Sequence, residues 1–413
     1  MSNQDLDRYD VIKRLIRKEV NGTEAAKLIG LSIRQIRRLK GNVAMHGPQA
    51  LIHGNRGRHS NRRLSDKERQ KIVKLLHQRY QDFWPTHASE KLEELHNISH
   101  DPKTIRQIMI DQGLWKPRKG KKKKEHREWR QRKAHYGEME QFDGSYHDWF
   151  ENRLLGKQCL LLSVDDATNT ITHARFDDSE GVFPVFTFWL EYLQFHGKPM
   201  SIYVDRFSTY SMNHKLAKES PDTLTQFQRA ARELRIEPIL AKSPEAKGRV
   251  ETTFGTLQNR LIKEMRLKDI STMDRANQYL KDEFIPWYNA KYTIEPRGVT
   301  NFHKNISIKE KKQLNSIFSR QEERTVQNDF TISFNKQWLQ LAKQQPATIQ
   351  KRDKVVVEEH LDGSIKIRLR GRYLNYKPIS KGQKQTKKQI PWVIAANYAV
   401  KEPVHELTKV GHF

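Results

Sequence analysis

The chain has 413 residues, and its 76 lysine and arginine residues outnumber its 49 aspartate and glutamate residues, which gives a formal net charge of +27. A chain of this length is too long for one ordinary core, and it predicts about two to four domains. So large a positive excess favours a polyanionic partner, of which nucleic acid is the most common. A ribosome-associated or membrane-surface protein is the alternative, although no apolar run approaches membrane-spanning length.

The composition also limits the compartment and the kinds of site. Hydrophobic residues make up 36% of the chain and 8 residues are tryptophan, which excludes a wholly disordered basic tail. Cys159 is the only cysteine, so an intrachain disulfide framework and a cysteine-rich zinc site are both excluded. The N-terminal residues lack a charged segment followed by an apolar one, so we expect no signal peptide. These features predict a protein of the reducing cytoplasm.

Residues 1–52 show three short helical patterns joined by tight turns. Gly30 ends the second pattern, and Ser32 caps the third, whose apolar side chains recur at helical spacing. A helix, a short helix, a glycine turn and a basic helix in this order are typical of a helix-turn-helix domain. A plain three-helix bundle with a solvated basic face is the alternative. In the first case, the residues that contact DNA are Arg34, Gln35, Arg37, Arg38 and Lys40.

A second helix-turn-helix pattern occupies residues 64–115. Ser65 opens its first helix, and Asp101 followed by Pro102 is a good start signal for its third. We expect this third helix to be a recognition helix. Its outward residues, predicted to contact DNA, are Lys103, Arg106 and Gln107.

Two basic segments flank the second pattern. Residues 53–63 form a linker rich in glycine and arginine, which is either an arm along a minor groove or a simple tether. As an arm, it contacts DNA through Arg56, Arg58, Arg62 and Arg63. Residues 116–134 form a connector so rich in lysine and arginine that it cannot pack as a core. We expect it to contact DNA phosphates, above all through Lys121, Lys122, Lys123 and Lys124.

The central domain, residues 135–270, alternates between strand and helix patterns. Strands are predicted at 138–143, 158–164, 170–176, 199–204 and 237–241, and helices at 180–195 and 243–268. Three strands followed by helix, strand, helix, strand and helix is the order of an α/β ribonuclease-H-like domain. The chain is therefore predicted to be a multidomain α+β protein in which helix-turn-helix domains precede this core.

The C-terminal part changes from helices to strands. Residues 271–323 form a helical connector, with a helix from Met273 to Tyr292. Residues 324–380 show short strand patterns around a hairpin turn at Asp362 and Gly363, and we interpret them as a small β-barrel. The tail, residues 381–413, fits no pattern.

Three acidic residues fall where a ribonuclease-H-like fold brings chain segments together at one edge of its sheet. Asp143 ends the first strand, Asp205 ends the fourth, and Glu251 lies about two turns into the last helix. Carboxylates are ligands of hard divalent cations such as Mg²⁺, and two such ions can clamp the attacking and leaving oxygens of a phosphodiester. Lys247 and Arg249 flank the glutamate, and we expect them to hold DNA phosphates.

Asp165 and Asp166 form a rival acidic pair, because they follow a buried strand and could be catalytic. Their position between adjacent hairpin strands favours a turn with side-chain caps instead. The three acids at the first strand, the fourth strand and the last helix are a more specific signal than any one of them.

Four stretches of the sequence resemble the DDE transposases, most closely the ISNCY type of insertion-sequence transposase, which is related to retroviral integrases. They are QFDGSYHDWF at 141–150, VDDAT at 164–168, YVD at 203–205 and SPEAKGRVE at 243–251. The resemblance covers residues from about 10 to 380, and its central motifs are specific. Two features depart from integrases. A long gap of 45 residues separates Asp205 from Glu251, and two helix-turn-helix patterns stand in place of a zinc module.

The resemblance implies a bacterial, nucleoid-associated enzyme that acts on double-stranded DNA. It would cleave 3′ ends at terminal inverted repeats and join them to target DNA, without a covalent protein intermediate. Asp143, Asp205 and Glu251 match the family's catalytic and metal-binding acids one by one, and the implied cofactor is two Mg²⁺ ions, with Mn²⁺ as a substitute. Because two DNA ends must be held together, a homodimer or a higher oligomer on DNA is expected.

Two other functions stay open. A DNA-binding regulator could retain an inactive nuclease fold, but the intact set of three acids argues against it. A metal-dependent nuclease of the ribonuclease H or resolvase kind is the second alternative. Two helix-turn-helix patterns argue against a plain nuclease, because such an enzyme does not usually need to recognise specific duplex ends.

Overall fold

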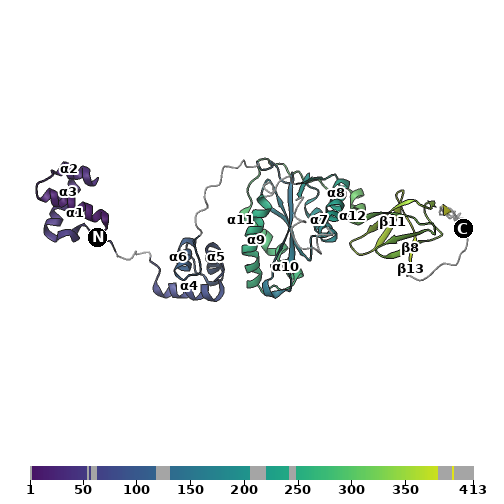
Figure 1. The fold of residues 1–413 in the computed structure, drawn as a ribbon, viewed down its shortest axis with the longest axis horizontal. Coiled ribbons are helices and arrows are strands. Elements are labelled where there is room, and N and C mark those ends of the chain that lie inside the picture. The colour runs from purple at the N-terminus through teal and green to yellow at the C-terminus, as the bar shows by residue number, and fades with distance from the viewer. Residues whose placement is uncertain are drawn as a thin grey trace, which may run out of the picture. The chain divides into compact units, whose positions relative to one another are not determined.

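The structure is a computed structural model that describes residues 2–53, 55–56, 63–117, 131–204, 220–240, 248–379 and 393–394 (Figure 1). The chain divides into two compact units, residues 1–117 and residues 118–413. No helix in the described part of the chain is long and apolar enough to cross a membrane.

The first three helices form a small bundle with its own core. Each helix begins with a capping box, in which the N-cap side chain accepts from the backbone N–H three residues on, and the side chain of that residue accepts from the N-cap backbone N–H. Gly30 ends the second helix in the left-handed conformation (φ 73°), which favours glycine. Ile12, Ala25 and Ile36 are fully buried between the helices. The elements are α1 (Asn3–Ile16), α2 (Gly22–Ile29), α3 (Ile33–His46) and the short 3-10 helix η1 (Gly47–Leu51).

A second group of three helices follows the linker. Pro85 and Pro102 occupy the first turns of the second and third helices, where a missing N–H costs nothing. Asn97 ends the second helix in the left-handed conformation (φ 54°). Leu76, Leu92 and Ile105 are among the fully buried side chains. The helices are α4 (Asp66–Arg79), α5 (Pro85–His96) and α6 (Pro102–Asp111).

The second unit is built on a mixed five-stranded sheet of order β3-β2-β1-β4-β5. The first three strands are antiparallel neighbours, whereas β4 runs parallel to β1 and β5 runs parallel to β4. This order and these directions are those of the predicted ribonuclease-H-like core. The strands are β1 (Glu140–His147), β2 (Gln158–Asp165), β3 (Ile171–Asp177), β4 (Ser201–Val204) and β5 (Glu237–Leu240).

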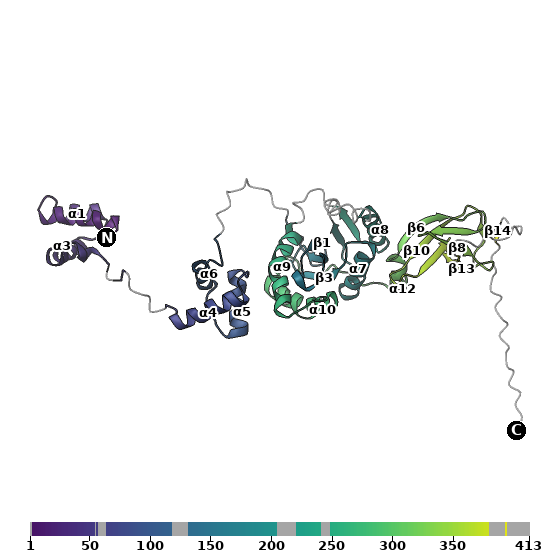
Figure 2. The same ribbon diagram turned by 60° about the horizontal axis from the view of Figure 1, so that its bottom comes forward.

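Helices cover both faces of the sheet, as Figures 1 and 2 show. Every residue of β2 is buried, and its side chains alternate between the two layers. Leu161 packs towards α7 and α8, whereas Leu160 and Leu162 pack towards α9 and α10. The helices are α7 (Val182–His196), α8 (Ser220–Glu233), α9 (Gly248–Leu267), α10 (Met273–Tyr279) and α11 (Ile285–Tyr292), with a π-helical turn at Leu280–Phe284 between the last two.

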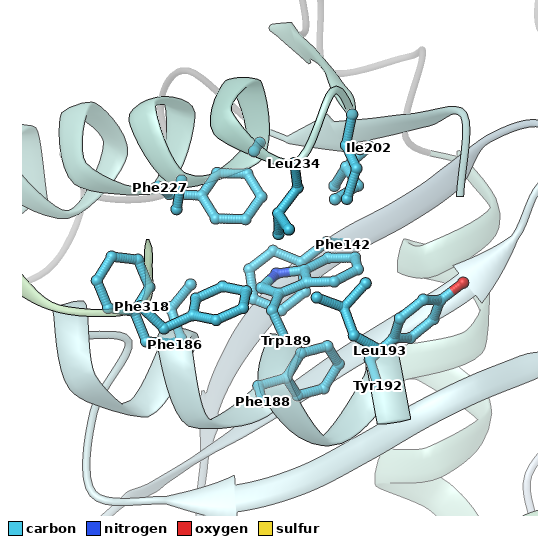
Figure 3. Close-up of a cluster of buried hydrophobic side chains, with 14 of the residues drawn as sticks. Phe142, Phe186, Phe188, Trp189, Tyr192, Leu193, Ile202, Phe227, Leu234 and Phe318 are labelled. Atoms are coloured by element: carbon cyan, nitrogen blue, oxygen red, sulfur yellow. The ribbon is translucent and has the colours of Figure 1, made fainter. Parts of the chain in front are cut away.

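Aromatic side chains fill the layer between the sheet and α7 (Figure 3). Trp189 lies at the centre of this cluster, with ring centroids 5.3 Å from Phe142, 5.5 Å from Phe188 and 5.8 Å from Phe227. Edge-to-face and tilted contacts of this kind stabilise a core beyond the area that they bury. The cluster therefore joins β1, α7 and α8 into one layer.

The C-terminal strands begin at Arg320, earlier than the position 324 predicted from the sequence. The first of these strands, RQEERT, carries no apolar residue, so its pairing with β10 could not be seen as an alternating pattern. The strands form sheets of order β12-β11-β10-β6, β13-β8-β7 and β14-β9. They are β6 (Arg320–Thr325), β7 (Thr331–Phe334), β8 (Gln337–Leu341), β9 (Ile349–Gln350), β10 (Lys354–Glu359), β11 (Ile365–Leu369), β12 (Arg372–Tyr373), β13 (Tyr376–Ile379) and β14 (Val393–Ile394).

Helix α12 (Ile308–Ile317) leads into these strands, and α8 holds the junction. Arg229 on α8 donates to the carbonyl oxygens of Ile317 at 3.0 Å and Ser319 at 2.7 Å. Gln226, one turn earlier, exchanges two hydrogen bonds with Gln321, at 2.7 and 3.1 Å. We call these four bonds the α8 clasp.

Leu161→Ala should destabilise the second unit by about 2–5 kcal/mol, because Leu161 is fully buried in the α7 layer and its loss leaves a cavity. Urea unfolding of the full chain, followed by tryptophan fluorescence, measures the change. Leu155→Ala is the matched control, since Leu155 is 97% exposed and its truncation should cost less than about 0.5 kcal/mol. Equal effects of the two substitutions would contradict this packing.

Glu310→Gln should lower stability at neutral pH, and the deficit should shrink as the pH falls. Glu310 contacts Lys198 at 2.5 Å and caps α12, and the hydrogen bonds from Lys198 and Ser307 hold its pKa at about 2, below the ordinary 4.5. Because the pKa of Glu310 is lower in the folded state than in the unfolded state, its carboxylate stabilises the folded protein at pH values above 4.5. This contribution to stability is lost as the pH falls towards about 2.

Urea midpoints at pH 7 and at pH 3 test this expectation. Glu283→Gln is the control, because its ion pair with Lys268 is exposed. A deficit for Glu310→Gln that stays constant between the two pH values would refute the assignment.

Candidate active site

One face of β1 is polar where it meets α9. Gln141 and Ser145 both contact this helix: the Gln141 Oε1 atom accepts from the Val250 amide at 3.3 Å, and Gln258 donates to Ser145 at 3.4 Å. Asp143 lies between them in a strand whose side chains alternate, so it faces the same helix. One oxygen of its carboxylate, Oδ1, is buried.

Glu251 lies in the first turn of α9, directly after Val250. Gln258 follows it by seven residues, about two helical turns, so Glu251 and Gln258 share one side of the helix. Because Gln258 contacts Ser145 on β1, this side of α9 runs along the strand. Asp143 and Glu251 therefore lie on facing surfaces of β1 and α9. The Glu251 side chain is exposed.

The third predicted acid, Asp205, lies outside the described residues, as does Lys247. Asp205 directly follows Val204, the last residue of β4. Within the described part of the chain, no group of three or more histidine, cysteine, aspartate or glutamate residues is placed to hold a metal ion.

Of the rival acidic pair, Asp166 accepts from segments far away in the sequence, whereas Asp165 caps a turn near the start of β1. Asp165 is paired with Glu140, the first residue of that strand. Its carboxylate accepts from the backbone of Gly137 at 3.0 Å and from the backbone and hydroxyl of Thr168 at 2.8 and 2.7 Å. Burial raises its pKa above the usual range. The structure thus shows side-chain caps of a turn at this position.

Arg249, predicted to hold a DNA phosphate, contacts Asp166 within the chain. Its Nη1 atom lies 2.5 Å from Asp166 Oδ1, and its side chain is only 17% exposed. Gln141 donates to the same oxygen at 2.6 Å. These contacts join residues that are far apart in the sequence, and no local pattern signalled them.

Glu180 is a further acid that the sequence did not single out. A Cβ atom at Gly144 would lie 2.8 Å from Glu180 Oε2, so the glycine lets this carboxylate approach β1. Burial raises the pKa of the Cys159 thiol well above its usual range, and the negative charges of Glu180 and Asp143 raise it further. Cys159 is thus a buried thiol beside the acidic strand and not a reactive one.

The predicted DNA contacts of α3 lie on its outer face. Arg34, Arg37 and Arg38 are exposed, and Lys40 is half-buried. Gln35 is also exposed, but its side-chain oxygen accepts from Ser32 in the capping box of the helix. The helix therefore presents a run of arginine side chains to solvent.

Several other predicted contacts have partners within the chain. Arg56 contacts Asp5 at 2.5 Å, and the hydrogen bonds of Ser2 and Arg56 hold the pKa of Asp5 at about 2. Arg63 contacts Asp66 at 3.0 Å. On α6, Lys103 and Arg106 are exposed, whereas Gln107 donates to Asp111 at 2.8 Å. Outside the described residues are Arg58, Arg62, Lys121, Lys122, Lys123 and Lys124.

Comparison with solved structures gives only weak overall similarity. The HTLV-2 integrase catalytic core domain in complex with magnesium aligns over 40% of this chain and 94% of its own, with 18% identity and a TM-score of 0.28. The simian T-cell lymphotropic virus intasome in complex with PP2A regulatory subunit B56 gamma aligns over 76% of this chain and 100% of its own, with 15% identity and a TM-score of 0.33. Scores this low carry no argument about function.

Sequence relatives are more similar. No protein-family model matches the chain. The "Transposase for insertion sequence IS1202" of Streptococcus pneumoniae is 28% identical over 394 residues, which cover 87% of this chain and 83% of the relative. The Sinorhizobium fredii protein named "Putative transposase y4bF" is 37% identical over 387 residues, which cover 94% of this chain and 83% of that protein. Identity of 37% over nearly the whole length shows that the chain belongs to a transposase family.

Proposed function

We propose that this chain binds the terminal inverted repeats of an insertion sequence, cleaves their 3′ ends and joins them to target DNA. The observation that carries the proposal is the placement of Asp143 and Glu251 on facing surfaces of β1 and α9, in a chain that belongs to a transposase family. Asp143, Asp205 and Glu251 are the proposed catalytic acids.

The strand pairing supports Asp205 as the third acid. Gln141 on β1 pairs with Tyr203 on the parallel strand β4. Asp143 follows Gln141 by two residues, and Asp205 follows Tyr203 by two residues. Both acids thus stand two residues after the members of one described pair in the sequence.

The donor set suits a hard divalent cation. Asp143, Asp205 and Glu251 offer only carboxylate oxygens, the ligands that Mg²⁺ and Mn²⁺ prefer in proteins. When bound, two such ions activate the attacking oxygen and stabilise the leaving oxygen of a phosphodiester. The chain's own part is to hold the carboxylates: β1 carries Asp143 within a rigid sheet, and Val250 anchors the first turn of α9 to that strand.

Recognition of the DNA ends is proposed for the N-terminal helices. Helices α1–α3 and α4–α6 would act as two helix-turn-helix domains, with α3 and α6 in major grooves. The exposed arginine run of α3 supports this, because arginine reads guanine edges and contacts phosphates. The strands from β6 to β13 would form a small β-barrel, and a dimer or larger assembly would hold two DNA ends together.

Two alternative functions make different predictions for purified protein. A regulator with an inactive nuclease fold would bind terminal-repeat DNA but never cut or join it. A metal-dependent nuclease would cut DNA without preference for terminal sequences. No contact in the structure favours either over the transposase.

Glu251→Gln and Asp143→Asn should each abolish joining of labelled terminal-repeat DNA to target DNA in Mg²⁺, because each removes one carboxylate charge from the proposed site. Loss of an outer-shell partner of a metal ligand typically costs about 10–100-fold, so removal of a ligand itself should cost at least the upper end of that range. Asp274→Asn is the matched control, since Asp274 is exposed in the first turn of α10 as Glu251 is in that of α9. Joining that persists in Glu251→Gln would mean that another acid is the ligand.

Arg37→Ala should weaken binding to terminal-repeat DNA by about 1–3 kcal/mol if Arg37 contacts a base edge. Fluorescence anisotropy at fixed salt measures the affinity, with unrelated DNA of equal length as the competitor. Lys13→Ala removes one exposed positive charge from α1 and controls for the change in net charge. Equal losses for the two variants would argue against α3 as a recognition helix.

A further inference from the structure

Asp166 is fully buried and accepts hydrogen bonds from three separate segments of the second unit. The Lys133 amide donates to Oδ2 at 2.8 Å. Gln141 on β1 and Arg249 at the start of α9 both donate to Oδ1, at 2.6 and 2.5 Å. A buried carboxylate requires such donors, because hydrogen bonds from the protein must replace those that its oxygens would form with water.

Gln141 extends this contact to the backbone of α9. Its amide nitrogen donates to Asp166, and its amide oxygen accepts from the Val250 N–H at 3.3 Å. Turning the amide over would place its oxygen against the carboxylate and its NH₂ against an N–H donor. Both contacts would then be repulsive, so the network fixes the orientation of Gln141.

Arg249 provides the second link to α9. Its guanidinium contacts a carboxylate with no exposed surface, and charge-assisted bonds of this kind are among the stronger ones in proteins. Glu251 follows Arg249 by two residues, and Val250 stands between them. The first turn of α9 is thus linked to Asp166 at two consecutive residues, directly through the Arg249 side chain and, by way of Gln141, through the Val250 backbone.

We infer that Asp166 is a positioning residue, which sets the first turn of α9 against β1 and thereby holds Glu251 opposite Asp143. Its catalytic consequence rests on the proposed function, whereas the anchoring of α9 does not. Arg249 then acts inside the chain as part of this anchor. Asp166 itself does not contact the reacting DNA.

Asp165 provides a control that distinguishes a positioning role of Asp166 from a general requirement for the turn that contains both residues. It precedes Asp166 in the same turn and is equally buried, yet its hydrogen bonds go to Gly137 and Thr168, and none that the structure gives goes to α9. Asp165→Asn and Asp166→Asn therefore remove the same charge one residue apart. Only the second removes the negative charge from the acceptor of Arg249 and Gln141, and it replaces one of the two acceptor oxygens of Asp166 with an NH₂ donor.

The test compares Asp166→Asn, Asp165→Asn and wild type in the full chain by hydrogen exchange with mass spectrometry, which needs no activity. Exchange in residues 248–258 should accelerate by at least about tenfold in Asp166→Asn, as expected for a lost hydrogen bond to a charged group. Residues 182–196 of α7 serve as the internal reference. Mn²⁺ titration followed by electron paramagnetic resonance should show a weaker site in Asp166→Asn, and strand transfer should require more Mg²⁺.

Variants of Arg249 test the same contact in case Asp166→Asn fails to fold. Arg249→Gln keeps the buried carboxylate and its two neutral donors, so it should accelerate exchange at 248–258 less than Asp166→Asn does. Arg249→Lys, which retains the charge, should restore part of the protection. If Asp165→Asn accelerates α9 exchange as much as Asp166→Asn, or if neither does, the positioning role is wrong. If α9 exchange responds as expected but wild type neither binds Mn²⁺ nor joins DNA, the anchoring stands and the proposed function fails.

Discussion

The polar stripe of β1 is the constraint on which the site depends. Gln141, Asp143 and Ser145 face α9 across a layer that is otherwise filled by apolar side chains. Polar groups in such a layer must be paired or reach water, and here α9 supplies the partners. The helix can lie against the strand only in a register that satisfies Gln141 and Ser145, so the same pairing that stabilises the layer also sets the position of Glu251 along β1.

The order of elements in the core could be predicted because it depends on local patterns. The alternation in β1 and β3, the uninterrupted apolar run of β2 and the long amphipathic α9 are all visible in the sequence. The family assignment from short motifs was confirmed by a relative of 37% identity. Strand β6 was not predicted, because a strand made only of charged and polar residues shows no alternation.

The candidate site was predicted less completely. Asp143 was predicted to end the first strand and Glu251 to lie about two turns into the last helix, whereas β1 continues to His147 and Glu251 lies in the first turn of α9 as the structure describes it. Asp143, Asp205 and Glu251 all stay predictions as metal ligands. The contact of Arg249 with Asp166 joins residues 83 positions apart, which no periodicity reveals. Charge alone likewise does not reveal that Arg56, although exposed, forms an ion pair with Asp5. A count of basic residues therefore overstates the surface that is available to DNA.

The α8 clasp attaches helix α8 to the chain segment that leads into the C-terminal strands. Tension on the C-terminal strands would reach Arg229 and Gln226 through the chain at 317–321 before it reached the sheet. Four hydrogen bonds loaded together resist such a pull better than bonds broken one at a time. Helix α8 also lies, in the sequence, between Asp205 and β5. A pull on the C-terminal strands would thus load α8, the helix that precedes β5 in the sequence.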